Sequence, residues 1–185
     1  MNAEATIPEV ITYPAAEPKI RLRSIARYFF FGLLLVTLGF GSYFLISRFM
    51  LQSVQVVGMS MFPTLEDSHH YLLNRLVYYF RDPRQKEIVV LRDPVDNGYS
   101  VKRVIAREGD SVFLQGGQVF VNGQKLSEPY LPIHTPTYPN GRAKDQLIVC
   151  GNATYFVLGD NRMNSADSRA YGPVPRQRIL GMIMH

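Results

Sequence analysis

The sequence predicts a mostly β protein, in which an antiparallel β-sheet domain follows a single membrane-spanning helix. Three observations carry this prediction. An apolar run without charges occupies residues 28–46. From Gln52 onward, short runs rich in Val, Ile, Tyr and Phe alternate with Gly, Pro, Asn and Asp, which is typical of strands and turns. Asn122–Gly123 stands between two such runs, and this dipeptide is a strong signal for a two-residue hairpin turn.

The apolar run reads YFFFGLLLVTLGFGSYFLI, nineteen residues long. A bilayer core needs roughly 20. A cleaved secretory signal would have a shorter apolar run and a pair of small residues at its cleavage site, and a buried core helix would be apolar on one face only. A retained signal-anchor therefore fits the run better than either alternative.

Charge on either side of the run predicts its orientation. Only Arg48 follows closely, whereas four basic residues precede it: Lys19, Arg21, Arg23 and Arg27. Because positive flanks stay in the cytoplasm, the larger part of the chain should lie outside. The predicted organisation is a cytoplasmic tail at 1–27, disordered over its Pro-containing first 18 residues, a transmembrane helix at 28–46 and an extracytoplasmic domain at 50–185.

The strands of this domain are expected in seven segments, with an irregular Pro-containing excursion at 128–153. The segment 69–80, HHYLLNRLVYYF, fits either a helix or a pair of strands. The expected strand segments are 53–58, 87–91, 99–105, 110–114, 118–126, 154–160 and 178–184.

Composition excludes several function classes. The net charge is +5, but the basic residues form no dense block, and zinc-finger, P-loop and RNA-binding signatures are missing, so no nucleic-acid partner is predicted. The single cysteine, Cys150, cannot form an intrachain disulfide and is expected to be a small buried residue. The four histidines lack the spacing of a ligand set, so neither a metal nor a cofactor is predicted.

One serine has apolar neighbours on both sides. Ser60 lies in GMSMFPTL, residues 58–65. A serine hydroxyl is a poor nucleophile unless a base activates it. The histidines are poorly placed by sequence, and the other candidate base is Lys102 in YSVKRVIAREGD. Strand alternation puts its side chain on the face of Ser100 and Val104, although a lysine in a strand is usually only a surface charge.

Three segments in this order, GMSMFPTL, YSVKRVIAREGD and GDNRMNSADSRAYGPV, resemble the bacterial type I signal peptidases (peptidase family S26), as does EIVVLRDP between the first two. The resemblance implies a membrane-anchored serine endopeptidase with a Ser–Lys dyad, Ser60 as nucleophile and Lys102 as general base. A free lysine has a pKa near 10.4 and is protonated at neutral pH, but burial against apolar groups lowers that pKa. The apolar neighbours of Ser60 fit this need.

The same resemblance assigns supporting roles around the dyad. Some family members carry a serine hydroxyl at the position of Gly58 as an oxyanion donor; here the Ser60 N–H remains as one candidate donor. Ser165 is implied to orient the lysine ammonium, and Asp167 and Arg169 to form a supporting ion pair.

The third segment also contains residues with less specific expectations. Residues 160–162, Asp-Asn-Arg, are expected to shape the loop, with ordinary turn chemistry as an equal alternative. Arg103 should be structural, because it faces away from Lys102 in a strand. Met163 and Glu108 depart from the family pattern and affect only the expected loop geometry.

The implied substrates are secretory preproteins with small residues at the −1 and −3 positions. The fourteen residues from Ile46 to Ser60 span at most about 50 Å, which keeps the serine near the membrane surface. An extended substrate would add to the strand edge at 53–61, with alternate side chains in small pockets. The residues expected to bind substrate, three of which are also candidates for contact with the lipid bilayer, are Met59, Met61, Phe62 and Pro63.

Other functions fit the residues less well. A self-cleaving repressor would carry a DNA-binding domain where this chain has a membrane helix, and a penicillin-binding protein needs S-x-x-K, whereas Ser60 is followed by MFP. A catalytically inactive membrane-anchored β domain that binds secreted partners is the alternative from another class. Retention of all five expected active-site side chains argues against it.

Overall fold

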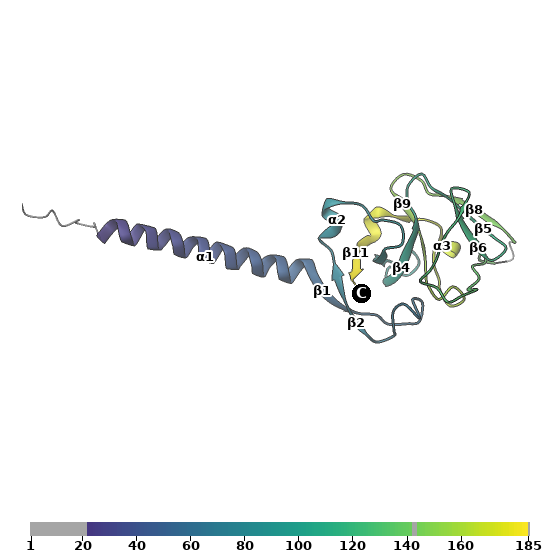
Figure 1. Ribbon diagram of the computed structural model, residues 1–185, viewed down its shortest axis with the longest axis horizontal. Helices are drawn as coiled ribbons and strands as arrows, with labels where there is room; N and C mark the ends of the chain where they lie inside the picture. The colour runs from purple at the N-terminus through teal and green to yellow at the C-terminus, as the bar shows by residue number, and fades with distance from the viewer. Residues whose placement is uncertain (1–21, 142–143, 185) are drawn as a thin grey trace, which may run out of the picture. The chain divides into compact units, whose positions relative to one another are not determined.

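A computed structural model describes residues 22–141 and 144–184 (Figure 1). Helix α1, Leu22–Met50, extends beyond both ends of the predicted span. Within it, Ile25–Phe44 is long and apolar enough to cross a bilayer, and its side chains are exposed. The disorder predicted for the first 18 residues falls outside the described residues. The chain divides into two units between residues 44 and 45, and the second unit holds all the strands.

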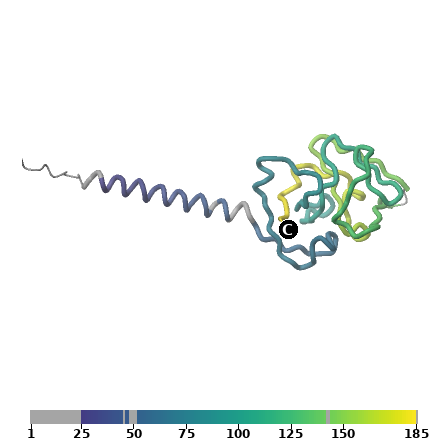
Figure 2. Tube along the Cα trace, in the orientation of Figure 1, coloured from purple at the N-terminus to yellow at the C-terminus, as the bar shows by residue number. Residues whose placement is uncertain are grey.

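The second unit consists of two sheets, and both are antiparallel, as the sequence predicts. The larger has the order β1-β2-β11-β3-β4-β9-β10 and the smaller β7-β6-β5-β8. Figure 2 shows the yellow C-terminal segment, β11, running among the blue and teal segments, where it pairs with β2 and β3. The strands are β1 Leu51–Gln55, β2 His70–Asn74, β3 Ile88–Arg92, β4 Tyr99–Ala106, β5 Ser111–Gln115, β6 Gln118–Val121, β7 Gln124–Lys125, β8 Gln146–Val149, β9 Thr154–Leu158, β10 Val174–Pro175 and β11 Ile179–Met184.

Three short helical segments join the strands: α2 Val77–Phe80, α3 Ser168–Tyr171 and the 3-10 turn η1 Arg176–Arg178. The ambiguous segment 69–80 therefore contains both structures, because β2 is followed by α2. The expected hairpin turn is confirmed, since Asn122 and Gly123 have φ values of 52° and 77°, the positive values that a type I′ turn requires.

Strand alternation sends side chains of the larger sheet into separate core clusters. Val89 and Leu91 of β3 join one cluster, whereas Ile88 and Val90 join another that lies beneath the Ser60 segment. The third cluster connects the two sheets and includes Cys150, which is buried as predicted. Its members are Ile105, Ala106, Val112, Leu114, Val119, Cys150, Phe156 and Leu158.

Two strands were not predicted, β8 and the two-residue β10, which pairs with β9. The excursion at 128–153 is irregular for most of its length, but β8 pairs with β5, and Val112 lies opposite Ile148. The smaller sheet therefore ends on a strand that comes from the region expected to be irregular.

Candidate active site

Ser60 lies in a turn that buried apolar side chains anchor. Met61 and Leu65 are 1 % and 0 % exposed and belong to the core cluster beneath the turn. Backbone hydrogen bonds from Phe62 N–H to Met59 C=O (3.2 Å) and from Leu65 N–H to Met61 C=O (3.0 Å) close the turn. The expected substrate and lipid contacts of Met61 are therefore corrected, because its side chain packs inward and fixes the turn.

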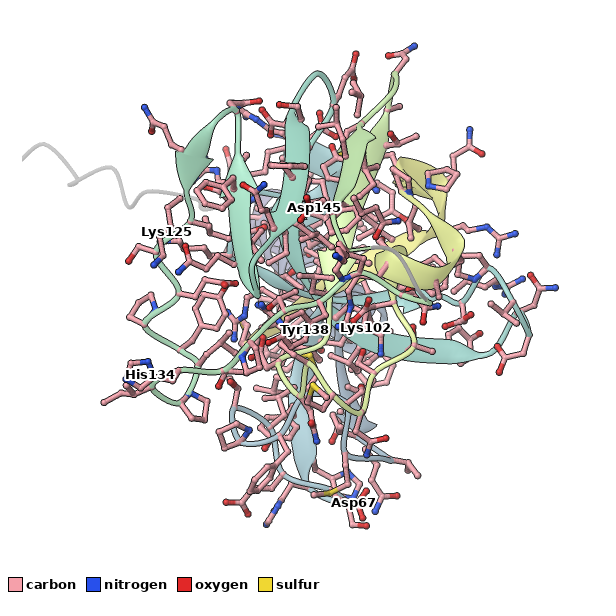
Figure 3. The ribbon with its side chains drawn as sticks, turned by 90° about the vertical axis from the view of Figure 1, so that its right-hand side faces the viewer. Asp67, Lys102, Lys125, His134, Tyr138 and Asp145 are labelled. Atoms are coloured by element: carbon pink, nitrogen blue, oxygen red, sulfur yellow. The ribbon has the colours of Figure 1, made fainter. Side chains whose placement is uncertain are left out.

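Lys102 comes from β4 and reaches the same point. Its side chain is 4 % exposed, and its Nζ lies 3.0 Å from Ser60 Oγ, within hydrogen-bond distance. In Figure 3, Lys102 lies in the middle of the domain, whereas Lys125 lies at its edge. The fold thus brings together the two residues that the sequence singled out, although 42 positions separate them.

Burial is the main influence on the Lys102 amine. It lowers the pKa of Lys102, because a charged ammonium is poorly solvated inside the fold. The carboxylates of Asp167 and Asp93 act in the opposite direction, and the Arg169 guanidinium acts with burial. The net direction favours the neutral amine, the form that can accept a proton from a hydroxyl.

The predicted ion pair of the third segment is present. Arg169 Nε lies 2.8 Å from Asp167 Oδ1, and the Asp167 side chain is fully buried. Asp167 also caps helix α3 and accepts a hydrogen bond from Gly159 N–H at 3.0 Å. This carboxylate therefore ties α3 to the end of β9 and places negative charge near Lys102.

The Ser165 hydroxyl is buried against Gly159. A Cβ built on that glycine would lie 2.2 Å from Ser165 Oγ and 2.5 Å from the Ser60 carbonyl oxygen, so only a glycine fits between them. Within residues 22–141 and 144–184, Ser165 Oγ has no hydrogen-bond partner, and a bond to Lys102 is not formed. Its expected orienting role therefore remains a prediction.

A buried ion pair connects β4 to the serine turn. Arg103, next to Lys102, donates to Asp160 through Nε (2.9 Å) and Nη2 (2.6 Å), and its guanidinium lies 3.8 Å from the centroid of the Tyr130 ring. Thr64 Oγ1 donates to the same carboxylate at 2.5 Å. Arg103 thus has the structural position expected of it, and Asp160 joins the strand of the base to the turn of the nucleophile.

Asn161 contacts the nucleophile turn twice. Its N–H donates to the Ser60 carbonyl and its Nδ2 donates to the Met59 carbonyl, both at 3.0 Å. Sequence reasoning placed Asn161 only in a loop. No sequence pattern indicates that Asn161 contacts Ser60, because 101 positions separate the two residues and only the fold brings them together.

The backbone amides of Gly58 and Ser60 differ in their hydrogen-bond partners. Gly58, whose φ of 105° suits glycine, donates its N–H to Asp67 Oδ1 at 2.7 Å, and this bond lowers the pKa of Asp67. The Ser60 N–H donates to no other group in the described part of the chain. Of these two amides, that of Ser60 is therefore the one left to donate to an oxyanion among the described residues.

A cleft of about 870 Å³ opens beside the dyad, large enough for several residues of an extended peptide. Met59, Ser60 and Lys102 line it together with Val90 and Val101. Phe62 is 46 % exposed and Pro63 is exposed, but neither lines this cleft. Their expected substrate contacts stay predictions.

Known proteins resemble this chain over most of its length. The family model "Signal peptidase, peptidase S26" matches residues 23–185. Signal peptidase I of Leptolyngbya laminosa is 36 % identical over 144 residues, covering 74 % of this chain and 68 % of that protein. Signal peptidase I T of Bacillus subtilis is 32 % identical over 148 residues, covering 74 % of each.

Among solved structures, a signal peptidase I from Enterococcus faecalis V583 aligns with a TM-score of 0.48 at 26 % identity, covering 56 % of this chain and 98 % of that one. The family match extends over nearly the whole chain, and the relatives above share about a third of their aligned residues with it. The chain therefore belongs to the peptidase S26 family of signal peptidases and is a serine endopeptidase that removes signal peptides.

Proposed function

We propose that this protein cleaves secretory preproteins by acyl transfer, with Ser60 as the nucleophile and Lys102 as the general base. The observation that carries the proposal is the 3.0 Å separation of Lys102 Nζ and Ser60 Oγ inside a site where Lys102 is nearly inaccessible to solvent. An amine held neutral by burial needs no histidine to activate the serine.

In the first half of the reaction, neutral Lys102 accepts the Ser60 proton while Oγ attacks the scissile carbonyl carbon. The carbonyl oxygen becomes an oxyanion and accepts a hydrogen bond from the Ser60 N–H. As the C–N bond breaks, the Lys102 ammonium gives its proton to the leaving amine, which becomes the N-terminus of the mature protein. The signal peptide remains as an ester on Ser60.

In the second half, Lys102 accepts a proton from a water molecule that attacks the ester carbonyl. Collapse of the second tetrahedral intermediate breaks the ester C–O bond, and the Lys102 ammonium returns the proton to Ser60 Oγ. We assign Ser165 the role of orienting the amine between these steps, and Asp167 with Arg169 the role of holding that loop. The burial of Ser165 Oγ and the 2.8 Å ion pair support these assignments.

The substrate would bind as an extended strand. The expected edge at 53–61 begins in β1, the outer strand of the larger sheet. Residues 99–102 of β4 offer a second edge beside the dyad, because they pair with β3 on one side and the pairing of β4 with β9 begins only at Arg103. Main-chain bonds to such an edge give affinity, and pockets for alternate side chains give specificity. Small residues at −1 and −3, with Met59 in the cleft wall, fit this mode of binding.

The proposed topology keeps residues 1–27 in the cytoplasm, 28–46 in the bilayer and 50–185 outside. Support comes from the apolar stretch Ile25–Phe44 and from the basic residues that precede it. A preprotein is held in the same bilayer by its own apolar segment, so both partners meet at the outer membrane surface.

The test is cleavage of a labelled preprotein by the full chain in detergent. Ser60→Ala and Lys102→Ala should each lower turnover by at least about 10³-fold, because dyad members act as a unit. Lys125→Ala, at an exposed lysine on β7, is the matched control and should cleave at the wild-type rate. Wild-type turnover by Lys102→Ala would refute the dyad, and a wild-type chain that binds preproteins without cleaving them would favour the inactive binding domain.

A further inference from the structure

We infer that Asn161 is a positioning residue whose side chain aims the Ser60 N–H at the oxyanion. The inference rests on the proposed acyl-transfer function and adds a residue to it. It begins from the two hydrogen bonds that Asn161 makes to the carbonyls on either side of the Ser60 Cα.

The side-chain bond fixes a peptide plane. Asn161 Nδ2 donates to Met59 C=O at 3.0 Å, and that carbonyl belongs to the same planar peptide as the Ser60 N–H. The Met59–Ser60 peptide is trans, so its C=O and N–H point in opposite directions. Holding the carbonyl toward Asn161 therefore turns the Ser60 N–H away from Asn161.

The second bond fixes the next plane along the chain. The Asn161 N–H donates to Ser60 C=O at 3.0 Å. With the planes on both sides of Ser60 held by one residue, the φ and ψ angles of the nucleophile have little freedom. The Phe62 N–H also reaches Met59 C=O, at 3.2 Å, but this bond lies within the turn and does not tie the turn to the rest of the fold.

Asn161 is itself held by its neighbours. Gly159 donates its N–H to Asp167, and Asp160 is paired with Arg103 in the buried ion pair. The residues that hold Asn161 in place therefore lie at the end of β9, and β9 pairs with the strand that carries Lys102. Orientation of the amide and placement of the base depend on the same strands.

The unoccupied amide makes this orientation important. The Gly58 N–H is engaged by Asp67, and glycine offers no side-chain donor, so the Ser60 N–H carries a large share of the oxyanion stabilisation. Loss of one oxyanion donor costs about 10²–10³ in kcat in a serine peptidase. A donor that is loosened rather than removed should cost less, about 10- to 100-fold.

Two substitutions separate the side-chain bond from the backbone bond. Asn161→Ala removes the Nδ2 donor, and Asn161→Asp keeps the shape but replaces the donor by an acceptor; both retain the backbone N–H to Ser60. Asn152→Ala, at an exposed asparagine whose side chain makes no hydrogen bond among the described residues, is the matched control. Thr64→Val removes a different bond to the same turn and leaves the Met59 carbonyl untouched.

The readout compares a peptide aldehyde, which forms a hemiacetal oxyanion with Ser60, with the peptide alcohol of the same sequence, which does not. For both Asn161 variants we expect kcat and aldehyde affinity to fall together by about 10- to 100-fold. Alcohol affinity, KM and the acidic limb of the pH profile should stay at wild-type values. Thr64→Val should lower the thermal midpoint with a smaller effect on kcat, and Asn152→Ala should change none of these.

Equal loss of aldehyde and alcohol affinity would overturn the inference, because a general collapse of the site weakens both ligands. Wild-type kcat in Asn161→Asp would overturn it as well. Failure of the proposed function looks different: the wild-type chain would form no aldehyde adduct on Ser60, or Ser60→Ala would retain cleavage. Assays run below the thermal midpoint of the least stable variant, so that unfolding does not imitate loss of the donor.

Discussion

Replacing Gly159 by alanine tests whether the close approach of β9 to the serine turn sets the reaction geometry. The added Cβ would lie 2.5 Å from the Ser60 carbonyl oxygen and 2.6 Å from Ser165 Cβ. The φ angle of Gly159 is not in the left-handed region, so an alanine there has an unstrained backbone and the effect of the substitution is steric. Residue 159 and the Ser60 turn must therefore move apart.

The expected magnitude follows from the overlap. The distance to the Ser60 oxygen is about 1 Å shorter than ordinary van der Waals contact. A misplacement of about 1 Å at reacting groups can cost about 10²-fold in rate. Overpacking of this kind costs about 1–3 kcal/mol of stability. Gly159→Ala should therefore lose about 10²-fold in kcat and remain folded.

Gly181→Ala is the matched control. A Cβ there would lie 2.7 Å from Leu73 Cδ1 and 2.8 Å from the Asn74 carbonyl oxygen, a comparable clash on β11, which β3 separates from the strand of Lys102. Both variants should show a lower thermal midpoint, but only Gly159→Ala should lose turnover of a labelled preprotein. Wild-type kcat in a folded Gly159→Ala protein would refute the reasoning that this contact places Ser60.

Two further predictions use the buried charges. Because burial lowers the pKa of Lys102 and only the neutral amine accepts a proton, kcat/KM should fall as pH drops through that lowered pKa; an acidic limb near 10.4, the ordinary lysine value, would contradict this. Arg103→Ala should lower the free energy of unfolding, measured with denaturant, by about 3–5 kcal/mol, because it leaves the Asp160 carboxylate buried with only a hydroxyl partner. Adding Asp160→Ala should then cost less than the sum of the single changes, and full additivity would contradict the pairing.

The sequence predicted a turn or a strand well where a few neighbouring residues determine that structure. The Asn122–Gly123 turn depends on two residues that adopt positive φ, and the strand alternation around Lys102 depends on a period of two. Strand β8 was missed for the opposite reason. It is four residues long, lies in a Pro-containing segment and is defined by pairing with β5, more than 30 positions away.

The site shows the same division. The sequence showed that the residues around Ser60 are apolar. It did not show which methionine faces the cleft, because side chains in a turn follow no simple period. Met59 lines the cleft and Met61 enters the core. The proximity of Lys102 was expected from family resemblance, whereas the contacts of Asn161 follow from no sequence pattern.

The three residues at the end of β9 explain how distant segments form one site. Gly159 donates to Asp167, whose charge acts on Lys102; Asp160 binds both Arg103 and the serine turn; and Asn161 binds the Ser60 backbone. Burial of the amine by itself destabilises the fold, because the unfolded chain binds the Lys102 proton more readily; stability therefore rises with pH between the lowered pKa and the ordinary one. The hydrogen bonds of this short segment offset part of that cost where the base meets the nucleophile, so the interactions that stabilise the fold there also position the reacting atoms.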